Sequence, residues 1–166
     1  MPIAEMPCMS DYGVGGAEWK PLPWSWAATR LAATHNFWLV TVGADGRPHS
    51  MPVWGVWHEP TERFAFGCSA DAKKARNIAA NSAVTFTNDD TTECISVQGT
   101  ANLVTAGSAL DDWVSLFVAK YGAESGPDFG EFMRRHPMFE VTPTAAFGII
   151  ERPEEFAARA TRWRFS

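Results

Sequence analysis

The chain has 166 residues, of which 46% are hydrophobic and 20% are charged, and its formal net charge is -5. This length suits one domain with a single core, and the composition is that of a globular protein and not of a disordered one. The negative net charge argues against a general nucleic-acid binder, because affinity for the phosphate backbone needs a basic face.

The three cysteines are Cys8, Cys68 and Cys94, which lie far apart without CxxC spacing. This pattern predicts neither a zinc site nor a disulfide scaffold and fits a reducing compartment. The N-terminus has no signal-like apolar run after basic residues, and no later stretch has the apolar length of a membrane span. We therefore expect a soluble cytoplasmic protein.

Residues 1–22 contain Pro, Gly and Met without periodicity, which predicts an irregular N-terminal arm. The remaining residues, 23–166, are predicted to form one domain. The segment WSWAATRLAATH, which follows Pro23, has the apolar spacing of a helix. Next come two predicted strands, 37–42 and 49–59, and a turn at Asp45-Gly46 joins them into a hairpin.

The rest of the chain predicts more strands with helices inserted between them. Strands are expected at 63–69, 83–88, 94–104, 138–151 and 161–165, and helices at 69–81, 108–121 (ending before Gly122) and 128–135. Strands joined by hairpins form an antiparallel sheet, and closure into a barrel removes its open edges. The expected fold is therefore a mainly β barrel of six to seven antiparallel strands, and not a doubly wound α/β fold.

The stretch SADAKKARN, residues 69–77, places cationic side chains in the first turns of the helix that follows a strand. A helix N-terminus favours anions through its free N–H groups and its dipole. Lys73, Arg76 and Asn77 have the i, i+3, i+4 spacing of one face, and the opposite, packable face holds Ala72, Ala75 and Ala79. A solvated helix surface would also explain the charges, but the preceding strand and its GCS turn favour an anion site.

The strand that contains MPVWGVW carries a second signal. Pro52 within a strand indicates a sheet edge, and Gly55 indicates close approach of another backbone or a ligand. An ordinary core strand is the alternative. The histidines have no metal-ligand spacing and are expected in turns or at the surface, so no metal site is predicted; they are His35, His49, His58 and His136. No GxSxG motif is present, and Cys68 has no evident nucleophile partner.

Four motifs carry a resemblance by their order and spacing: DGRPHSMPVWGVW, FAFGCS, KKARNIAANSAVTFT and ISVQGTANLV. Together they resemble the split β-barrel superfamily typified by pyridoxamine 5'-phosphate oxidase, in particular its flavin and deazaflavin oxidoreductases. The similarity covers residues 37–104 and the terminal TRWRF. The N-terminal arm and the predicted helices at 108–121 and 128–135 lie outside it.

The resemblance implies a homodimer that holds its cofactor in grooves at the subunit interface. The residues that match this site are Pro52, Val53 and Trp54 along the ring; Gly67, Cys68 and Ser69 along the ribityl chain; Lys73, Lys74, Arg76 and Asn77 at the phosphate or acidic tail; and Gln98, Gly99, Trp163 and Arg164 from the other subunit. No catalytic side chain is implied, because the cofactor would supply the chemistry.

The implied activity is hydride transfer between a non-covalently bound deazaflavin, coenzyme F-420, and a small organic substrate. Aromatic walls from Trp54, Trp57 and Trp163 suggest an apolar, unsaturated or aromatic substrate. F-420 is preferred over FMN because the KKxRN arrangement resembles the deazaflavin-using branch, and extra cations suit a tail with phosphate and carboxylates. The alternatives are an FMN-binding flavin reductase or pyridoxamine phosphate oxidase-like enzyme, and a non-catalytic flavin, F-420 or haem-binding protein.

Overall fold

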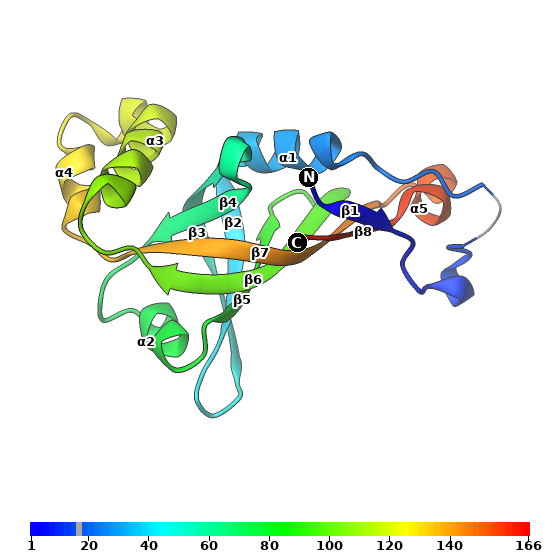
Figure 1. The fold of residues 1–166 in the computed structure, drawn as a ribbon, viewed down its shortest axis with the longest axis horizontal. Coiled ribbons are helices and arrows are strands. Elements are labelled where there is room, and N and C mark those ends of the chain that lie inside the picture. Colours follow the sequence, from blue (N-terminus) through cyan, green and yellow to red (C-terminus); the bar gives the residue numbers. More distant parts are fainter. Residues whose placement is uncertain (16–17) are drawn as a thin grey trace.

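The computed structural model describes residues 1–15 and 18–166 and contains one eight-stranded antiparallel sheet (Figure 1). Six strands follow the order β7-β4-β3-β2-β5-β6, and pairing between β6 and β7 closes them into a barrel. The barrel strands are β2 (Asn36–Val42), β3 (Pro48–His58), β4 (Arg63–Gly67), β5 (Ala83–Asn88), β6 (Glu93–Leu103) and β7 (Met138–Ile150). The predicted mainly β, split-barrel fold class is thus confirmed.

Two short strands extend the sheet beyond the barrel. β8 (Thr161–Arg164) pairs with β7, and β1 (Ile3–Glu5) pairs with β8. The prediction of an irregular arm over residues 1–22 is therefore wrong at β1 and at η1, a 3-10 turn over Ser10–Tyr12. A three-residue strand is too short to show periodicity, and only its pairing with the other end of the chain defines it.

The inside of the barrel is filled by aromatic rings. Phe64 stacks on Phe86 with their centroids 4.0 Å apart, and Phe37 meets Phe64 edge to face at 4.8 Å. Helix α1 (Trp24–Ala33) packs against this core and directs the indole of Trp24 to the rings of Trp57 and Trp163, at 5.8 and 5.3 Å. Edge-to-face pairs add to the burial of large apolar surfaces in holding such a core together.

Helices α3 (Ser108–Ser125) and α4 (Phe129–Arg134) form a pair at one end of the molecule (Figure 1). Their apolar side chains make a second small core with residues from β3, β4 and β7. The predicted helix end before Gly122 is wrong. The terminating residue is Gly126, whose φ of 88° lies in the left-handed region that favours glycine and breaks the helix.

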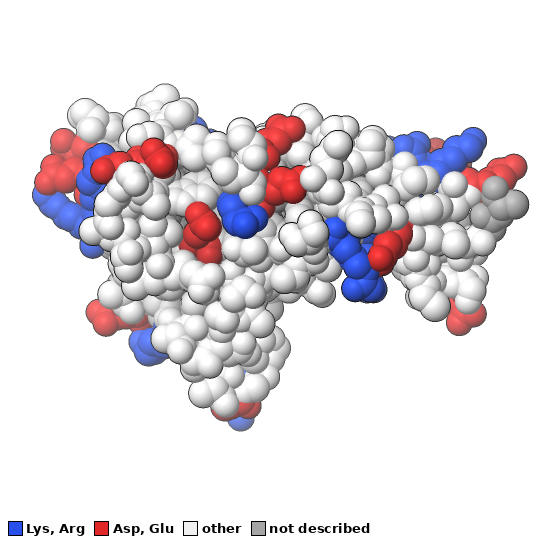
Figure 2. Space-filling model, in the orientation of Figure 1, with Lys and Arg blue, Asp and Glu red and all other residues white. Residues whose placement is uncertain are grey.

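The remaining helices are α2 (Lys73–Ala80) and α5 (Pro153–Arg159), with a 3-10 turn η2 (Glu59–Thr61) after β3. Helix α5, seven residues long with proline in its first turn, was not predicted from the sequence. Figure 2 shows acidic and basic side chains along the body of the molecule as well as at its two ends, with fewer of them on the lobe of α2 and the β2–β3 hairpin. Among the described residues, no helix is long and apolar enough to cross a membrane.

Candidate cofactor groove

The candidate site begins where strand β3 separates from β4. β3 pairs with β2 from Pro48 to Trp54, but it pairs with β4 only from Gly55 onward. The first half of β3 therefore has no strand neighbour on its second side, and its backbone polar groups there are open to other partners. The prediction of an edge at Pro52 is confirmed for this half of the strand.

Gly55, at the point of separation, is closely approached by a core side chain. A Cβ there would lie 2.3 Å from Cζ of Phe64, so the approaching group is a ring of the barrel core and not a ligand. The Gly55 backbone also receives helix α3: its N–H donates to the Tyr121 hydroxyl at 3.0 Å, and its carbonyl accepts from Lys120 Nζ at 2.9 Å. These bonds fix α3 beside the open edge of β3.

A groove of about 510 Å³ lies along this edge. That volume falls within the range of about 300–1,000 Å³ typical of small-molecule sites. The lining residues are Pro52, Val53 and Trp54 of β3; Gly67 at the end of β4; Cys68, Ser69 and Ala72 of the following loop; Lys74 of α2; Phe117 of α3; Phe129, Phe132 and Met133 of α4; and His136. Seven predicted cofactor residues thus come together in one groove within a single chain: Pro52, Val53, Trp54, Gly67, Cys68, Ser69 and Lys74.

Trp54 forms a rigid part of the groove wall. Its indole stacks on the ring of Tyr121 with centroids 4.7 Å apart and an interplanar angle of 4°, and it remains 38% exposed. His35 packs edge to face against both rings and pairs with Glu124 at 2.7 Å. An aromatic face held flat in this way suits contact with another planar group.

The other end of the groove is positively charged. Lys74 lines it, whereas Lys73 and Arg76 occupy the same turn of α2 but are exposed. Across the described chain, none of these three cations forms a salt bridge with a carboxylate. Arg76 instead donates to the backbone carbonyl of Asp71 at 2.6 Å. Cations without acidic partners remain available to an anionic ligand.

Asn77 does not belong to this charged end. Its side chain is buried, and Nδ2 donates to Oγ1 of Thr41 at 3.0 Å, so it attaches α2 to β2. The predicted division of the helix into faces is wrong for the same reason: Asn77 and Ile78 face inward, while Ala79 is exposed. The buried face of α2 is the one that packs against the barrel strands, and helical spacing alone does not reveal which face that is.

Two titratable groups near the groove show the effect of burial. Desolvation raises the pKa of the Cys68 thiol, and the nearby charge of Lys74 opposes this in part. Desolvation also lowers the pKa of Lys120 to about 8. The Lys120 ammonium donates to the carbonyls of Thr34, at 2.6 Å, and Gly55. Because burial raises its pKa, the Cys68 thiol is protonated at neutral pH, which suits it to lining the site and not to nucleophilic attack.

The four residues predicted to come from the other subunit lie outside this groove. Gln98 and Gly99 line a separate hollow on β5 and β6, beside the register shift of β6 against β7. Trp163 is fully buried in the barrel core, so its predicted role as a cofactor contact or aromatic wall is wrong; the same holds for Trp57, which is 4% exposed. Arg164 is exposed and binds Glu5 at 2.7 Å.

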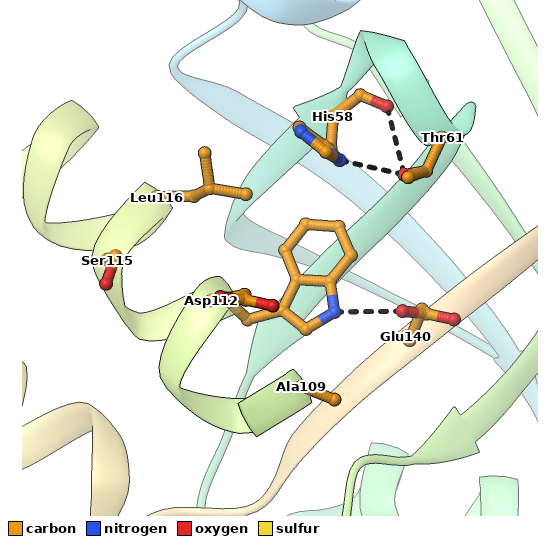
Figure 3. Close-up of a pocket in the computed structure, with 8 residues that line it drawn as sticks. His58, Thr61, Ala109, Asp112, Ser115, Leu116 and Glu140 are labelled. Atoms are coloured by element: carbon orange, nitrogen blue, oxygen red, sulfur yellow. Dashed lines mark hydrogen bonds between the residues drawn. The ribbon is translucent and has the colours of Figure 1, made fainter. Parts of the chain in front are cut away.

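A second hollow of about 550 Å³ lies between α3, β7 and the end of β3 (Figure 3). Its polar groups largely satisfy each other. His58 bonds to Thr61 at 2.8 Å, and Trp113 Nε1 donates to Glu140 at 2.9 Å. Because it lacks an open strand edge and a cationic end, this hollow is less suited to a flavin-type cofactor than the groove.

Five lining residues from α3, α4 and the segment just after α4 were not predicted from the sequence. They are Phe117, Phe129, Phe132, Met133 and His136. The apolar spacing of this region predicted helices but not the surface on which they pack. The contact that places α4 is remote in sequence: Cys68 N–H donates to the Pro137 carbonyl at 3.1 Å. Among the described residues, no group of three or more potential metal ligands occurs.

The fold recurs in solved structures. The haem storage protein HutZ from Vibrio cholerae is 17% identical with a TM-score of 0.60, and the match covers 70% of this chain and 87% of HutZ. An F-420 reductase is 24% identical with a TM-score of 0.53, over 71% of this chain and 93% of its own. A pyridoxamine 5'-phosphate oxidase-related, FMN-binding protein from Nostoc punctiforme PCC 73102 is 18% identical with a TM-score of 0.55, over 78% and 84%.

At these identities the structures establish the fold alone, and they differ in the ligand that their names record. No curated protein matches the sequence. The sequence profile of the pyridoxamine 5'-phosphate oxidase family, however, matches residues 27–149, which include both inserted helices and the six barrel strands except the last residue of β7. The chain therefore belongs to the pyridoxamine 5'-phosphate oxidase family.

Proposed function

We propose that the protein is an oxidoreductase that binds coenzyme F-420 non-covalently in the groove and uses it to reduce or oxidise a small organic substrate. The observation that carries this proposal is the composition of the groove. One end joins an open strand edge to flat aromatic and apolar walls, and the other end presents cations without acidic partners. A tricyclic ring with an anionic tail matches both ends.

The residues of this chain would divide the work of binding. The open edge of β3 offers backbone hydrogen bonds to the polar rim of a ring, and Lys74 attracts the anionic tail. Phe129 and Phe132 reduce the access of water to the ring. When bound, the deazaflavin would supply hydride transfer, for which the protein needs to provide only position and a dry surface.

The preference for F-420 over FMN rests on charge. A tail that carries carboxylates in addition to phosphate gains more from Lys73, Lys74 and Arg76 than a single phosphate does. The structural similarity to an F-420 reductase agrees with this preference. FMN is the alternative ligand, in accord with the FMN-binding relative, and haem is a further one, in accord with HutZ. We also propose a cytoplasmic homodimer, in which Gln98 and Arg164 of one protomer approach the groove of its partner.

Equilibrium titration of the purified protein with F-420, FMN and haemin tests the proposal. We expect tightest binding of F-420, and Lys74→Ala should weaken it by about 1.5 to 3 kcal/mol, the contribution of a charge-assisted contact. The matched control is Lys20→Ala, because Lys20 is an exposed lysine that does not line the groove. Tighter binding of FMN or haemin would contradict the F-420 assignment. Equal effects of Lys74→Ala and Lys20→Ala would show that the groove is not the binding site.

A further inference from the structure

The inserted helices give the groove a wall with one titratable side chain. α3 and α4 contribute Phe117, Phe129, Phe132 and Met133, all apolar, and His136 lies two residues beyond the end of α4. No carboxylate lines the groove. The other titratable groups on it are Cys68 and Lys74, which lie on the opposite, β4–α2 side. His136 is thus the single imidazole in an otherwise apolar wall.

The orientation of this imidazole is set by its backbone contact. Nδ1 of His136 lies 2.8 Å from the carbonyl oxygen of Phe132, and its ring packs on the ring of Phe132 with centroids 4.2 Å apart. A carbonyl oxygen only accepts hydrogen bonds, so Nδ1 carries the hydrogen. Nε2 is then the nitrogen left for a ligand, since it has no hydrogen-bond partner within the described chain. The neutral ring can only accept there, whereas the imidazolium can donate.

The surrounding backbone keeps His136 beside the groove. The neighbouring Pro137 carbonyl accepts the Cys68 N–H at 3.1 Å, and Met138 pairs with Gly67 in the β4–β7 ladder. This joint ties the end of α4 to the loop that carries the predicted cofactor contacts. The charged groups at this helix are paired with each other or with α3: Glu131 binds Arg135, and Arg134 binds Asp111, so neither carboxylate is engaged with the imidazole.

We propose that His136 is the proton donor of the site, and that its substrate is a planar conjugated carbonyl compound whose carbonyl oxygen accepts from Nε2–H. This inference rests on the proposed function, which supplies the reductant. When bound, the reduced deazaflavin would supply the hydride, and with it two electrons, to the β-carbon of this substrate. The carbon–carbon π pair shifts toward oxygen, and the proton on Nε2 neutralises the resulting enolate. The substrate would gain two hydrogens, one as hydride and one as the proton from Nε2, and the imidazole would recover its proton from water.

Binding measurements test this inference without turnover. The probes are benzylideneacetone, a planar conjugated ketone, and (E)-1-phenyl-1-butene, which has a similar shape but no carbonyl. Affinity for the ketone should fall as pH rises, because only the imidazolium donates from Nε2. His136→Phe, which keeps a flat ring on Phe132, should lower that affinity about ten-fold or more and abolish its pH dependence. Neither change should affect the hydrocarbon.

A spectroscopic readout comes from the imidazole itself. In NMR spectra of the full-length protein at a fixed pH, the ketone should move the His136 ring signal toward that of the imidazolium, since the bound carbonyl favours the charged ring. The control is His58→Phe, because His58 lies in the separate hollow and bonds to Thr61 (Figure 3). It should leave ketone affinity unchanged.

The outcomes separate this inference from the proposed function. If F-420 binds but His136→Phe leaves ketone affinity and its pH profile unchanged, the proton-donor assignment is wrong and the cofactor proposal stands. If no flavin-type cofactor binds but the ketone still moves the His136 signal, the hydrogen-bonding subsite stands and the redox role is wrong.

Discussion

Tyr121→Phe tests how the helix pair is attached to the open strand of the barrel. The Tyr121 hydroxyl accepts the Gly55 N–H at 3.0 Å, and it lies 2.7 and 2.8 Å from the carbonyl oxygens of His35 and Gly55. Burial of this hydroxyl raises its pKa to about 12, so it stays protonated and able to donate. The substitution removes one oxygen and leaves the ring that stacks on Trp54.

The expected cost follows from the partners that lose their hydrogen bonds. The buried Gly55 N–H is left without an acceptor, which costs about 1 to 3 kcal/mol, and loss of the bond to the His35 carbonyl adds about 0.5 to 1.5 kcal/mol. The Gly55 carbonyl keeps the ammonium of Lys120 as a donor. We therefore expect the free energy of unfolding to fall by about 2 to 4 kcal/mol.

Urea unfolding followed by circular dichroism measures this change. With an m-value of about 2 kcal/mol per molar, the midpoint should fall by about 1 to 2 M without a change in slope. Tyr12→Phe is the matched control, because Tyr12 is 69% exposed and its hydroxyl makes no hydrogen bond within the described residues. If both variants unfold at the wild-type midpoint, the hydroxyl does not hold α3 on β3 and the reasoning fails.

Two more predictions concern packing and charge. Gly99→Ala should destabilise the fold more than Gly67→Ala in the same urea assay. A Cβ at Gly99 would lie 2.4 Å from the Thr142 carbonyl oxygen, which is fixed in the backbone, whereas the nearest atom to a Cβ at Gly67 is the flexible end of Met133 at 3.0 Å. Equal losses of stability in the two variants would contradict this prediction. Burial lowers the pKa of Lys120 from 10.5 to about 8, so between these values the unfolded chain binds more protons and the free energy of unfolding should rise with pH. Measured from pH 7.5 to 10.5, this rise should exceed that of Lys120→Met by about 1 to 3 kcal/mol, and parallel profiles would show that the charge is not buried.

Much of the fold was predictable because its signals are local. The apolar spacing in α1 placed Trp24, Ala27, Ala28 and Leu31 on one face, and these residues are buried there. Alternation in β2 and β5 marked strands in the same way, since side chains on a strand point to opposite faces in turn. Two elements escaped prediction: β1 is only three residues long and too short to show a period, and α5 has no buried residue and so no apolar face to mark it.

The candidate site was predictable in part. Residues 52–54 and 67–69 were assigned from motifs on adjacent strands, and the structure brings both stretches to one groove. Trp163 was assigned from the resemblance of the terminal TRWRF, which does not say which side chains of that strand the core encloses, and the structure buries it fully. Asn77 was misassigned because its partner, Thr41, is 36 residues away on β2.

The sequence by itself determined most of the strand and helix pattern, the family and the cationic helix start at Lys73 and Lys74, because each depends on residues close together along the chain. Tertiary structure alone decided which side chains face the groove. The packing of α1 on the sheet buried Trp163 beside Trp24, and the bond from Cys68 to Pro137 set α4 and His136 against the loop after β4. Such placements depend on long-range pairing, which no local spacing encodes.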